Sequence, residues 1–303
     1  MAQNMQVKNA VVTGGTDGIG KEIAQGLVRA GHRLILVGRD AEKGARAAQE
    51  LLATTGNSGV RFIPADLSSL AETERLARDV ILHFPRIHYL VHSAGIVRGR
   101  RELTKDGVES NFAVNFLSRF ALTQRLLPAL KVAGQPGHTA RVVMISGAAR
   151  NGTIHFDDVN LAKHFSILRV VSQFCAANDV FTVELSRRMA LCSEELRVTI
   201  TCLKIGVVKT NIRRDFPMWM KWLVPLLADP LLGQTPCEAA SAALRLLLSD
   251  EFEGVTGALF LKIKKFKRLP APSNEQHSET GSQLWRLSER LANAASIKRR
   301  SQP

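Results

Sequence analysis

Residues 11–20 read VVTGGTDGIG, and this stretch decides the fold. An apolar run ends at Thr13, and a helical stripe of Ile19, Ile23 and Leu27 follows it. Glycines between a strand and a helix let the backbone turn tightly and approach a phosphate, toward which the first helical N–H groups point. A glycine-rich turn alone is weak evidence, but its place between a strand and a helix is what a dinucleotide-binding turn requires.

Short runs rich in Val and Ile alternate with helical patterns along the rest of the chain. Strands separated by helices imply right-handed βαβ units, so the sequence predicts an α/β fold with a doubly wound parallel sheet, the Rossmann type. The expected strands are residues 10–12, 34–37, 60–63, 89–91, 142–145, 198–203 and 258–261.

Composition favours a single domain. A chain of 303 residues with 45% hydrophobic content can bury a full core. The sequence contains no run of about 18 apolar residues, so it predicts no membrane span. The first residues lack the pattern of a secretory signal. The four cysteines have no paired spacing, so we expect reduced thiols, no metal site and a cytoplasmic protein.

The net charge of +14 is concentrated near the C-terminus. Ten Lys or Arg and three Glu after residue 260 give +7, and residues 262–268 are the densest run. A solvated strand end and tail explain this run more simply than nucleic acid or an anionic membrane surface, neither of which we expect as a partner.

The chain divides into residues 1–270, a dinucleotide-binding domain with an apolar lid at about 211–235, and residues 271–303. The second segment is read as a polar loop at 270–282, an amphipathic helix and a basic tail. Its apolar positions are Leu284, Trp285, Leu287 and Leu291.

Two residues at strand ends suggest which dinucleotide is bound. Arg39 follows the second strand, where an acid would bond the ribose 2′-hydroxyl of NAD; an arginine favours the 2′-phosphate of NADP. Asp66 follows the third strand, where a carboxylate can accept a hydrogen bond from the adenine amino group. A surface arginine at a strand end is the alternative for Arg39.

These motifs resemble the short-chain dehydrogenase/reductase family, in its retinol-dehydrogenase-like branch, over nearly the whole chain. The matching segments are Thr13–Gly20, Asp66–Leu67, Ser93–Gly95, Arg101–Thr104, Asn111–Asn115, Arg141–Val143, Ile154–Phe156, Glu184–Arg188 and Leu284–Arg290. The resemblance implies NADP(H) as cofactor, a possible homodimer, and a substrate lid at about 211–235 over a lipophilic small molecule. The apolar stretch there could instead dock a partner, lie on a membrane surface or pack on the protein's own core. The implied cofactor residues are Gly14, Thr16, Asp17, Gly18, Ile19, Gly20, Arg39, Asp66, Leu67, Ser93, Ala94, Gly95 and Thr210.

The family's catalytic residues are largely replaced. Its helix carries tyrosine and lysine one turn apart, and the lysine lowers the tyrosine pKa so that it exchanges a proton near neutral pH. Those positions hold Val171 and Cys175, and the family's serine aligns with Gly147. Only Asn115 of the four remains, and the chain's single tyrosine is Tyr89. We therefore expect a degenerate member that binds NADP(H) without ordinary carbonyl reduction.

The end of the site that would hold the nicotinamide is altered as well. Ile205 stands where the family has the proline of a Pro-Gly turn, and His92-Ser93 stands for two asparagines before Ala-Gly. Thr210, which would meet the carboxamide, is retained. The adenosine end of the site is thus closer to the family pattern than the reacting end.

Other groups offer substitute chemistry. Cys175 is expected to be a core residue, although a thiol can donate a proton or act as a nucleophile. His155, Lys163 and His164 precede the central helix and can act as acids or bases. Lys204 is expected at the surface or near a phosphate. These residues leave open an alternative, an enzyme rewired for atypical redox or non-redox chemistry, such as cyclisation or isomerisation of a lipophilic small molecule.

Overall fold

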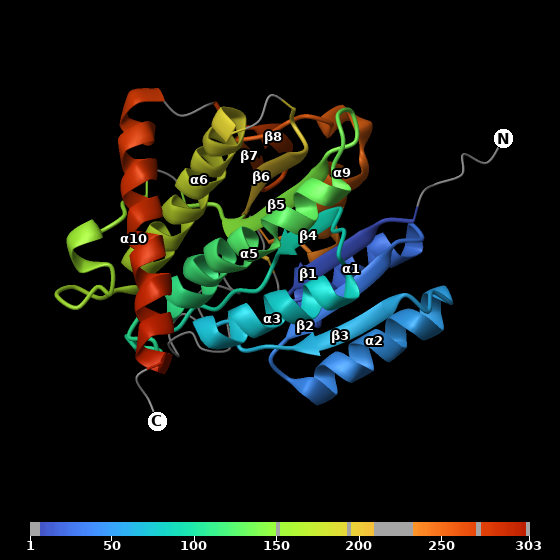
Figure 1. The fold of residues 1–303 in the computed structure, drawn as a ribbon, viewed down its shortest axis with the longest axis horizontal. Coiled ribbons are helices and arrows are strands. Elements are labelled where there is room, and N and C mark those ends of the chain that lie inside the picture. The colour runs from blue at the N-terminus through green and yellow to red at the C-terminus, as the bar shows by residue number, and fades with distance from the viewer. Residues whose placement is uncertain (1–6, 150–151, 193–194, 209–232, 271–273, 301–303) are drawn as a thin grey trace.

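The structure is a computed structural model, and it describes residues 7–149, 152–192, 195–208, 233–270 and 274–300. An eight-stranded sheet in the order β3-β2-β1-β4-β5-β6-β7-β8 forms its centre (Figure 1). All pairs from β3 to β7 are parallel, and only β8 runs antiparallel to β7. The predicted doubly wound α/β sheet is confirmed. The strands are β1 (Asn9–Thr13), β2 (Arg33–Gly38), β3 (Val60–Pro64), β4 (Tyr89–His92), β5 (Ala140–Gly147), β6 (Val198–Ile205), β7 (Ala258–Lys262) and β8 (Phe266–Arg268).

The helices begin where the sequence supplies capping side chains. Asp17, Asp40 and Ser69 each accept a backbone hydrogen bond at the first turn, and Thr235 forms a capping box with Glu238. The helices are α1 (Gly18–Arg29), α2 (Ala41–Thr55), α3 (Leu70–His83), α4 (Ser110–Phe112), the π-helical η1 (Ala113–Leu117), α5 (Ser118–Ala133), the 3₁₀ turn η2 (Phe156–Asp158), α6 (Ile167–Cys192), α9 (Pro236–Leu248), the 3₁₀ turn η5 (Asp250–Phe252) and α10 (Asn274–Arg300).

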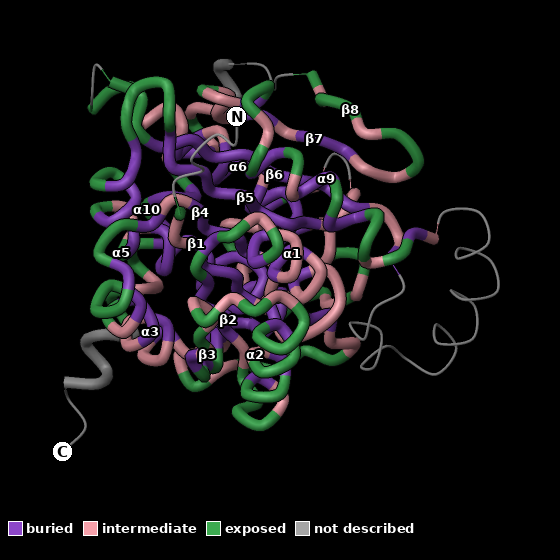
Figure 2. Tube along the Cα trace, turned by 90° about the vertical axis from the view of Figure 1, so that its right-hand side faces the viewer, coloured by how far each residue is buried: buried purple, intermediate pink, exposed green. Residues whose placement is uncertain are grey.

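Two apolar cores lie on the two faces of the sheet. Side chains of α1, α2 and α9 pack on one face, and those of α3, α5, α6 and α10 pack on the other. Figure 2 shows the central strands buried and the exposed positions on the outer sides of the helices. Since both faces are covered, the strands can be apolar throughout, as the sequence pattern requires.

The basic run at residues 262–268 lies at the edge of the sheet. Lys262 ends β7, and the chain returns antiparallel as β8, where Lys267 and Arg268 are exposed. The sequence pattern did not predict this hairpin. Charged side chains on a short edge strand discourage pairing with another chain, which gives this run a structural role.

The predicted loop at 270–282 is wrong for most of its length, because α10 already begins at Asn274. Polar residues there form the first turns of a helix whose later turns are anchored by packing. Leu284 and Trp285 are buried, and the Trp285 ring contacts Phe120 edge-on at 5.1 Å. Arg188 stacks over the same indole at 4.0 Å. Figure 1 shows α10 lying across the outer side of α5 and α6. Within the described residues, no helix has the length and apolarity needed to cross a membrane.

Candidate functional site

The glycine-rich turn packs so closely that side chains are excluded from it. Gly14 has φ +67°, and a Cβ there would lie 2.7 Å from Cα of Ala94. A Cβ on Gly20 would lie 2.2 Å from the carbonyl oxygen of Gly14. The Gly14 N–H donates to the Val37 carbonyl at 2.8 Å, which ties the turn to the end of β2. The turn and the start of α1 therefore form the backbone concavity that a pyrophosphate needs.

Asp17 and Ile19 lie at the start of α1, beside the positive-φ Gly18. The Asp17 carboxylate accepts from the Gly18 N–H at 2.7 Å, and Lys43 Nζ of α2 lies 2.5 Å from its other oxygen. Asp17 therefore caps α1 and links it to α2. Lys43 also offsets the negative charge that this carboxylate brings to a phosphate-binding turn.

Arg39 directly follows β2 and is exposed. Within the described part of the chain no ion pair engages it. The Thr16 side chain lies over neighbouring Gly38, where a Cβ would be 3.1 Å from Thr16 Cγ2 and 3.2 Å from its hydroxyl. Thr16, Arg39 and the start of α2 are thus neighbours at the end of β2. That donor set suits the 2′-phosphate of an adenosine ribose.

The other predicted residues of the adenosine side follow β3 and β4. Asp66 is exposed, and its carboxylate accepts from the Ser68 N–H at 3.0 Å, while Leu67 is buried. Thr13 Oγ1 accepts from the N–H groups of Ser93 and Ala94 at 3.2 and 3.3 Å. Ser93, Ala94 and Gly95 therefore lie beside the glycine turn at the carboxyl edge of the sheet. Thr210 and residues 211–232 of the predicted lid lie outside the described residues.

The two positions that the resemblance assigns to the family's serine and lysine are in contact. Gly147 ends β5, and a Cβ there would lie 3.0 Å from Sγ of Cys175 on α6. Cys175 is fully buried, and burial raises the pKa of its thiol. Val171 lies one turn earlier on α6 and is half-buried. The thiol fills space beside the end of β5, in agreement with the expected core role.

Asn115 holds a loop in place. It lies in the π-helical turn η1 and is buried, and its side-chain oxygen accepts from the Ile96 N–H at 3.0 Å. Its amide donates to the carbonyls of Ile96 at 2.7 Å and Asn111 at 2.8 Å. Its own carbonyl accepts from the Asn178 side chain at 3.0 Å. These bonds join the loop after β4 to α4, η1 and α6.

The expectation that Lys204 is a surface residue is wrong. It lies in β6, opposite Ser146 of β5, and is 1% exposed. Its ammonium forms an ion pair with Asp179 of α6, one turn beyond Cys175. The strand continues through Ile205 and places Lys204 on the sheet face that α6 covers, so the side chain is buried and needs a carboxylate partner.

Arg119 was missed by sequence reasoning. It lies one turn after Asn115 on α5, is 4% exposed, and donates to the carbonyls of Ala94 and Ile145, both at 2.7 Å. Desolvation lowers its pKa to about 10. The available signal was one charged residue inside an otherwise apolar helical stretch, AVNFLSRFAL at 113–122.

The segment before α6 holds His155, Lys163 and His164, the residues considered as substitute acids or bases. Its hydrogen bonds give them little support in that role. Asp158 accepts from the N–H groups of Ala162 and Lys163 at 2.7 and 3.0 Å, which lowers the pKa of its carboxyl. Its carboxylate therefore shapes this loop. The His155 N–H donates to Gln173 at 3.0 Å, and His164 is exposed.

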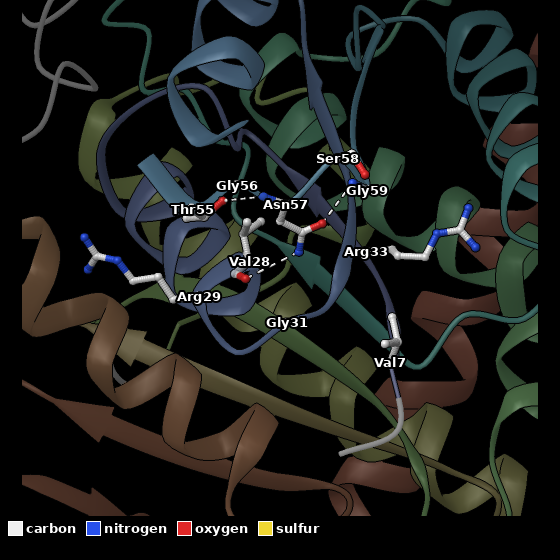
Figure 3. Close-up of a pocket in the computed structure, with 10 residues that line it drawn as sticks. All are labelled: Val7, Val28, Arg29, Gly31, Arg33, Thr55, Gly56, Asn57, Ser58 and Gly59. Atoms are coloured by element: carbon white, nitrogen blue, oxygen red, sulfur yellow. Dashed lines mark hydrogen bonds between the residues drawn. The ribbon is translucent and has the colours of Figure 1, made fainter. Parts of the chain in front are cut away.

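An open groove of about 580 Å³ lies at the amino ends of strands β2 and β3, away from the glycine turn (Figure 3). The end of α1, the start of β2 and the turn before β3 line it. Arg29 and Arg33 extend to either side, and Asn57 bonds the surrounding backbone. In a parallel sheet the glycine turn lies at the other ends of these strands, so this groove is separate from the dinucleotide site.

Comparisons with known proteins agree with the fold and the turn. The family model for short chain dehydrogenase matches residues 8–165. Human polyprenol dehydrogenase is 32% identical over 277 residues, which cover 91% of this chain and 82% of that protein. Human retinol dehydrogenase 14 is 33% identical over 306 residues, covering 94% of this chain and 86% of that protein.

Solved structures give the same result. An uncharacterised protein from Mycobacterium paratuberculosis superposes with a TM-score of 0.72 at 26% identity, covering 94% of this chain and 93% of that one. The active-site complex of Pseudomonas aeruginosa RhlG with NADP has a TM-score of 0.66 at 27% identity, covering 84% of this chain and 94% of that one. This chain therefore belongs to the short-chain dehydrogenase family, in its retinol-dehydrogenase-like branch.

Proposed function

We propose that this protein binds NADP(H) through an intact adenosine and pyrophosphate site but lacks the family's usual hydride-transfer machinery. The observation that carries the proposal is the contrast between the two parts of the predicted site. Gly14 and Gly20 keep a tight backbone turn in which a Cβ would not fit, while the Cys175 thiol packs against Gly147, where the resemblance places the family's serine.

The residues present fit the cofactor. Arg39, the Thr16 hydroxyl and the start of α2 supply donors for a 2′-phosphate, and the first turn of α1 supplies N–H groups for the pyrophosphate. At the reacting end, Nε of Arg119 is buried without a hydrogen-bond partner among the described residues. Buried polar atoms are normally satisfied, so this atom marks a place for a bound molecule or water.

The missing groups set the scale of the catalytic loss. A positioned general acid contributes roughly 10²–10⁴-fold in rate, and these positions offer an alkyl group, a buried thiol and no side chain. When bound, the nicotinamide ring would supply hydride chemistry. The residues at 147, 171 and 175 would line its surroundings without delivering a proton to a carbonyl oxygen.

Titration calorimetry with NADPH and NADH tests the cofactor proposal. We expect NADPH to bind more tightly, and Arg39→Ala to weaken NADPH binding about 10–100-fold through loss of a charge-assisted contact. Arg46→Ala is the matched control, because Arg46 is an exposed arginine of α2 paired only weakly with Glu42 at 3.8 Å. Equal binding of NADPH by wild type and Arg39→Ala would overturn the 2′-phosphate assignment.

Turnover tests the loss of chemistry. The relatives named above suggest retinoid and polyprenoid alcohols, with their carbonyl forms, as lipophilic substrates to assay. We expect no NADPH oxidation above background with the carbonyl forms. Reduction at rates normal for the family would refute the degenerate assignment.

A rewired enzyme is the second candidate, favoured by Lys204 and Arg119. Both are buried cations near the position of the lost lysine, and they can stabilise negative charge on a bound small molecule. A panel of lipophilic ligands, read out by thermal shift, separates the candidates. Binding followed by a changed product supports rewired chemistry, and the absence of any ligand response counts against it. A cytoplasmic location, a homodimer and a lipophilic ligand under residues 211–235 remain proposals.

A further inference from the structure

Two buried cations and one half-buried carboxylate lie near Cys202, at the reacting end of the proposed site. Arg119 comes from α5, Lys204 from β6 and Asp179 from α6. The first two are 4% and 1% exposed, and the Asp179 side chain is 20% exposed. Charges this deeply buried are rare, and each must be compensated or put to use.

The cluster carries one uncompensated positive charge. Lys204 and Asp179 form an ion pair and neutralise each other. Arg119 donates only to the carbonyls of Ala94 and Ile145, and within the described residues its Nε has no partner. Carbonyl dipoles orient the guanidinium but leave its unit charge in place.

The other titratable groups here add no charge. Burial raises the pKa of both Cys175 and Cys202, so the thiols stay protonated. Burial and the nearby Arg119 hold the pKa of His92 well below its ordinary value, so the imidazole is neutral and bonded to Thr123 at 2.8 Å. Among the residues that the structure describes, the net charge around this end of the site is therefore +1.

The same groups adjoin the positions implied to hold the nicotinamide. Arg119 binds the carbonyl of Ala94, one of the predicted cofactor residues, and that of Ile145, two residues before Gly147. Lys204 lies opposite Ser146 in the sheet. The cations thus approach the carboxyl ends of β4, β5 and β6, where family members bind the reacting half of the cofactor.

We propose that this buried positive charge makes the site select the reduced cofactor, NADPH, over the oxidised form. The inference rests on the proposed NADP(H) binding. The oxidised nicotinamide ring is a cation and the reduced ring is neutral, so a neighbouring unit charge repels only the oxidised form. At the effective dielectric of a partly buried site, one unit charge changes the affinity ratio on the order of tenfold. The protein would then report the reduction state of the cofactor pool.

The experiment measures the dissociation constants of both forms for the full chain. NADPH fluorescence gives one constant, and competition by NADP⁺ gives the other. We expect wild type to favour NADPH about tenfold, which corresponds to about 30 mV in the potential of the bound couple. Lys204→Gln and Arg119→Met each remove one positive charge by a different route, and both should bring the ratio close to one.

Two controls separate charge from structural damage. The double variant Lys204→Gln/Asp179→Asn removes the ion pair but keeps the net charge, so its ratio should match wild type. Arg39→Ala should weaken both forms equally and leave the ratio unchanged. Thermal melting identifies any variant that does not fold.

The outcomes are distinct. Equal wild-type affinities, or one common ratio in wild type and the folded charge-removing variants, overturn charge selection and leave cofactor binding intact. Failure of the wild type to bind either form overturns the proposed function, and this inference with it.

Discussion

Restoring the family's serine should destabilise this protein unless Cys175 is also changed. A Cβ on Gly147 would lie 3.0 Å from Sγ of Cys175, well inside the roughly 3.5–4.0 Å of ordinary non-bonded contact. Cys175 is fully buried on α6, so its sulfur has little room to retreat. Overpacking of this kind costs about 1–3 kcal/mol, and we expect Gly147→Ser to lower the free energy of unfolding by that amount.

A double-mutant cycle isolates the contact. Cys175→Ala alone should cost about 1 kcal/mol, because it removes one buried heavy atom and leaves a small cavity. In the Cys175→Ala background the serine gains space, so the double variant should be more stable than the sum of the two changes by about 1–2 kcal/mol. Urea unfolding with an unchanged slope measures each free energy.

Additive effects would refute the reasoning. If Gly147→Ser costs the same with cysteine or alanine at 175, the clash is not the cause of the loss. A favourable coupling would instead show that positions 147 and 175 are adapted to each other. Glycine at 147 would then be required by the thiol at 175.

Three further predictions concern stability. Burial lowers the pKa of His32 from 6.5 to about 4, so the unfolded chain takes up a proton at a higher pH than the folded protein does. The free energy of unfolding should therefore fall by on the order of 2 kcal/mol as pH drops from about 6.5 to 4. Acid unfolding should show this slope, and it should be shallower in His32→Gln. Arg141→Met should lower the free energy of unfolding by about 3–5 kcal/mol, because Glu253 loses its partner at 2.7 Å and β5 loses its hydrogen bonds to α9. A loss below about 1 kcal/mol in chemical unfolding would contradict this prediction. Trp285→Ala should cost about 3 kcal/mol and make α10 sensitive to limited proteolysis, whereas unchanged cleavage would show that α10 is anchored elsewhere.

The fold could be read from the sequence because its signals are local and repeated. Each predicted strand is an apolar run of sufficient length, and Asp17 caps a helix directly after the glycine turn. The sequence did not predict hairpin β7–β8, because Phe266–Arg268 is short and basic and has no apolar alternation. The early start of α10 escaped because polar turns gain their helical form from buried residues further along the chain.

The burial of Lys204 and Arg119 could not be predicted for a different reason. Lys204 follows an apolar strand and resembles a strand-end lysine, and its burial depends on Asp179, which lies 25 residues earlier on a helix. Arg119 finds its acceptors at the ends of two separate strands. Pairings between distant segments leave no periodic trace, so sequence reasoning could not identify these buried charges.

The losses and the replacements at the reacting end are of different kinds. By the resemblance, positions 147, 171 and 175 would hold a serine, a tyrosine that exchanges a proton with the substrate, and a lysine that lowers the tyrosine pKa; the chain has Gly147, Val171 and Cys175 there. The groups found there, Arg119 and Lys204, hold fixed positive charge and are bound by carbonyls or a carboxylate in positions where they cannot readily transfer a proton. Drift alone would not place a guanidinium in the interior, because each buried charge costs stability. Fixed charge of this kind is suited to distinguishing the charge of a ligand, and this is the reason that we propose binding over turnover.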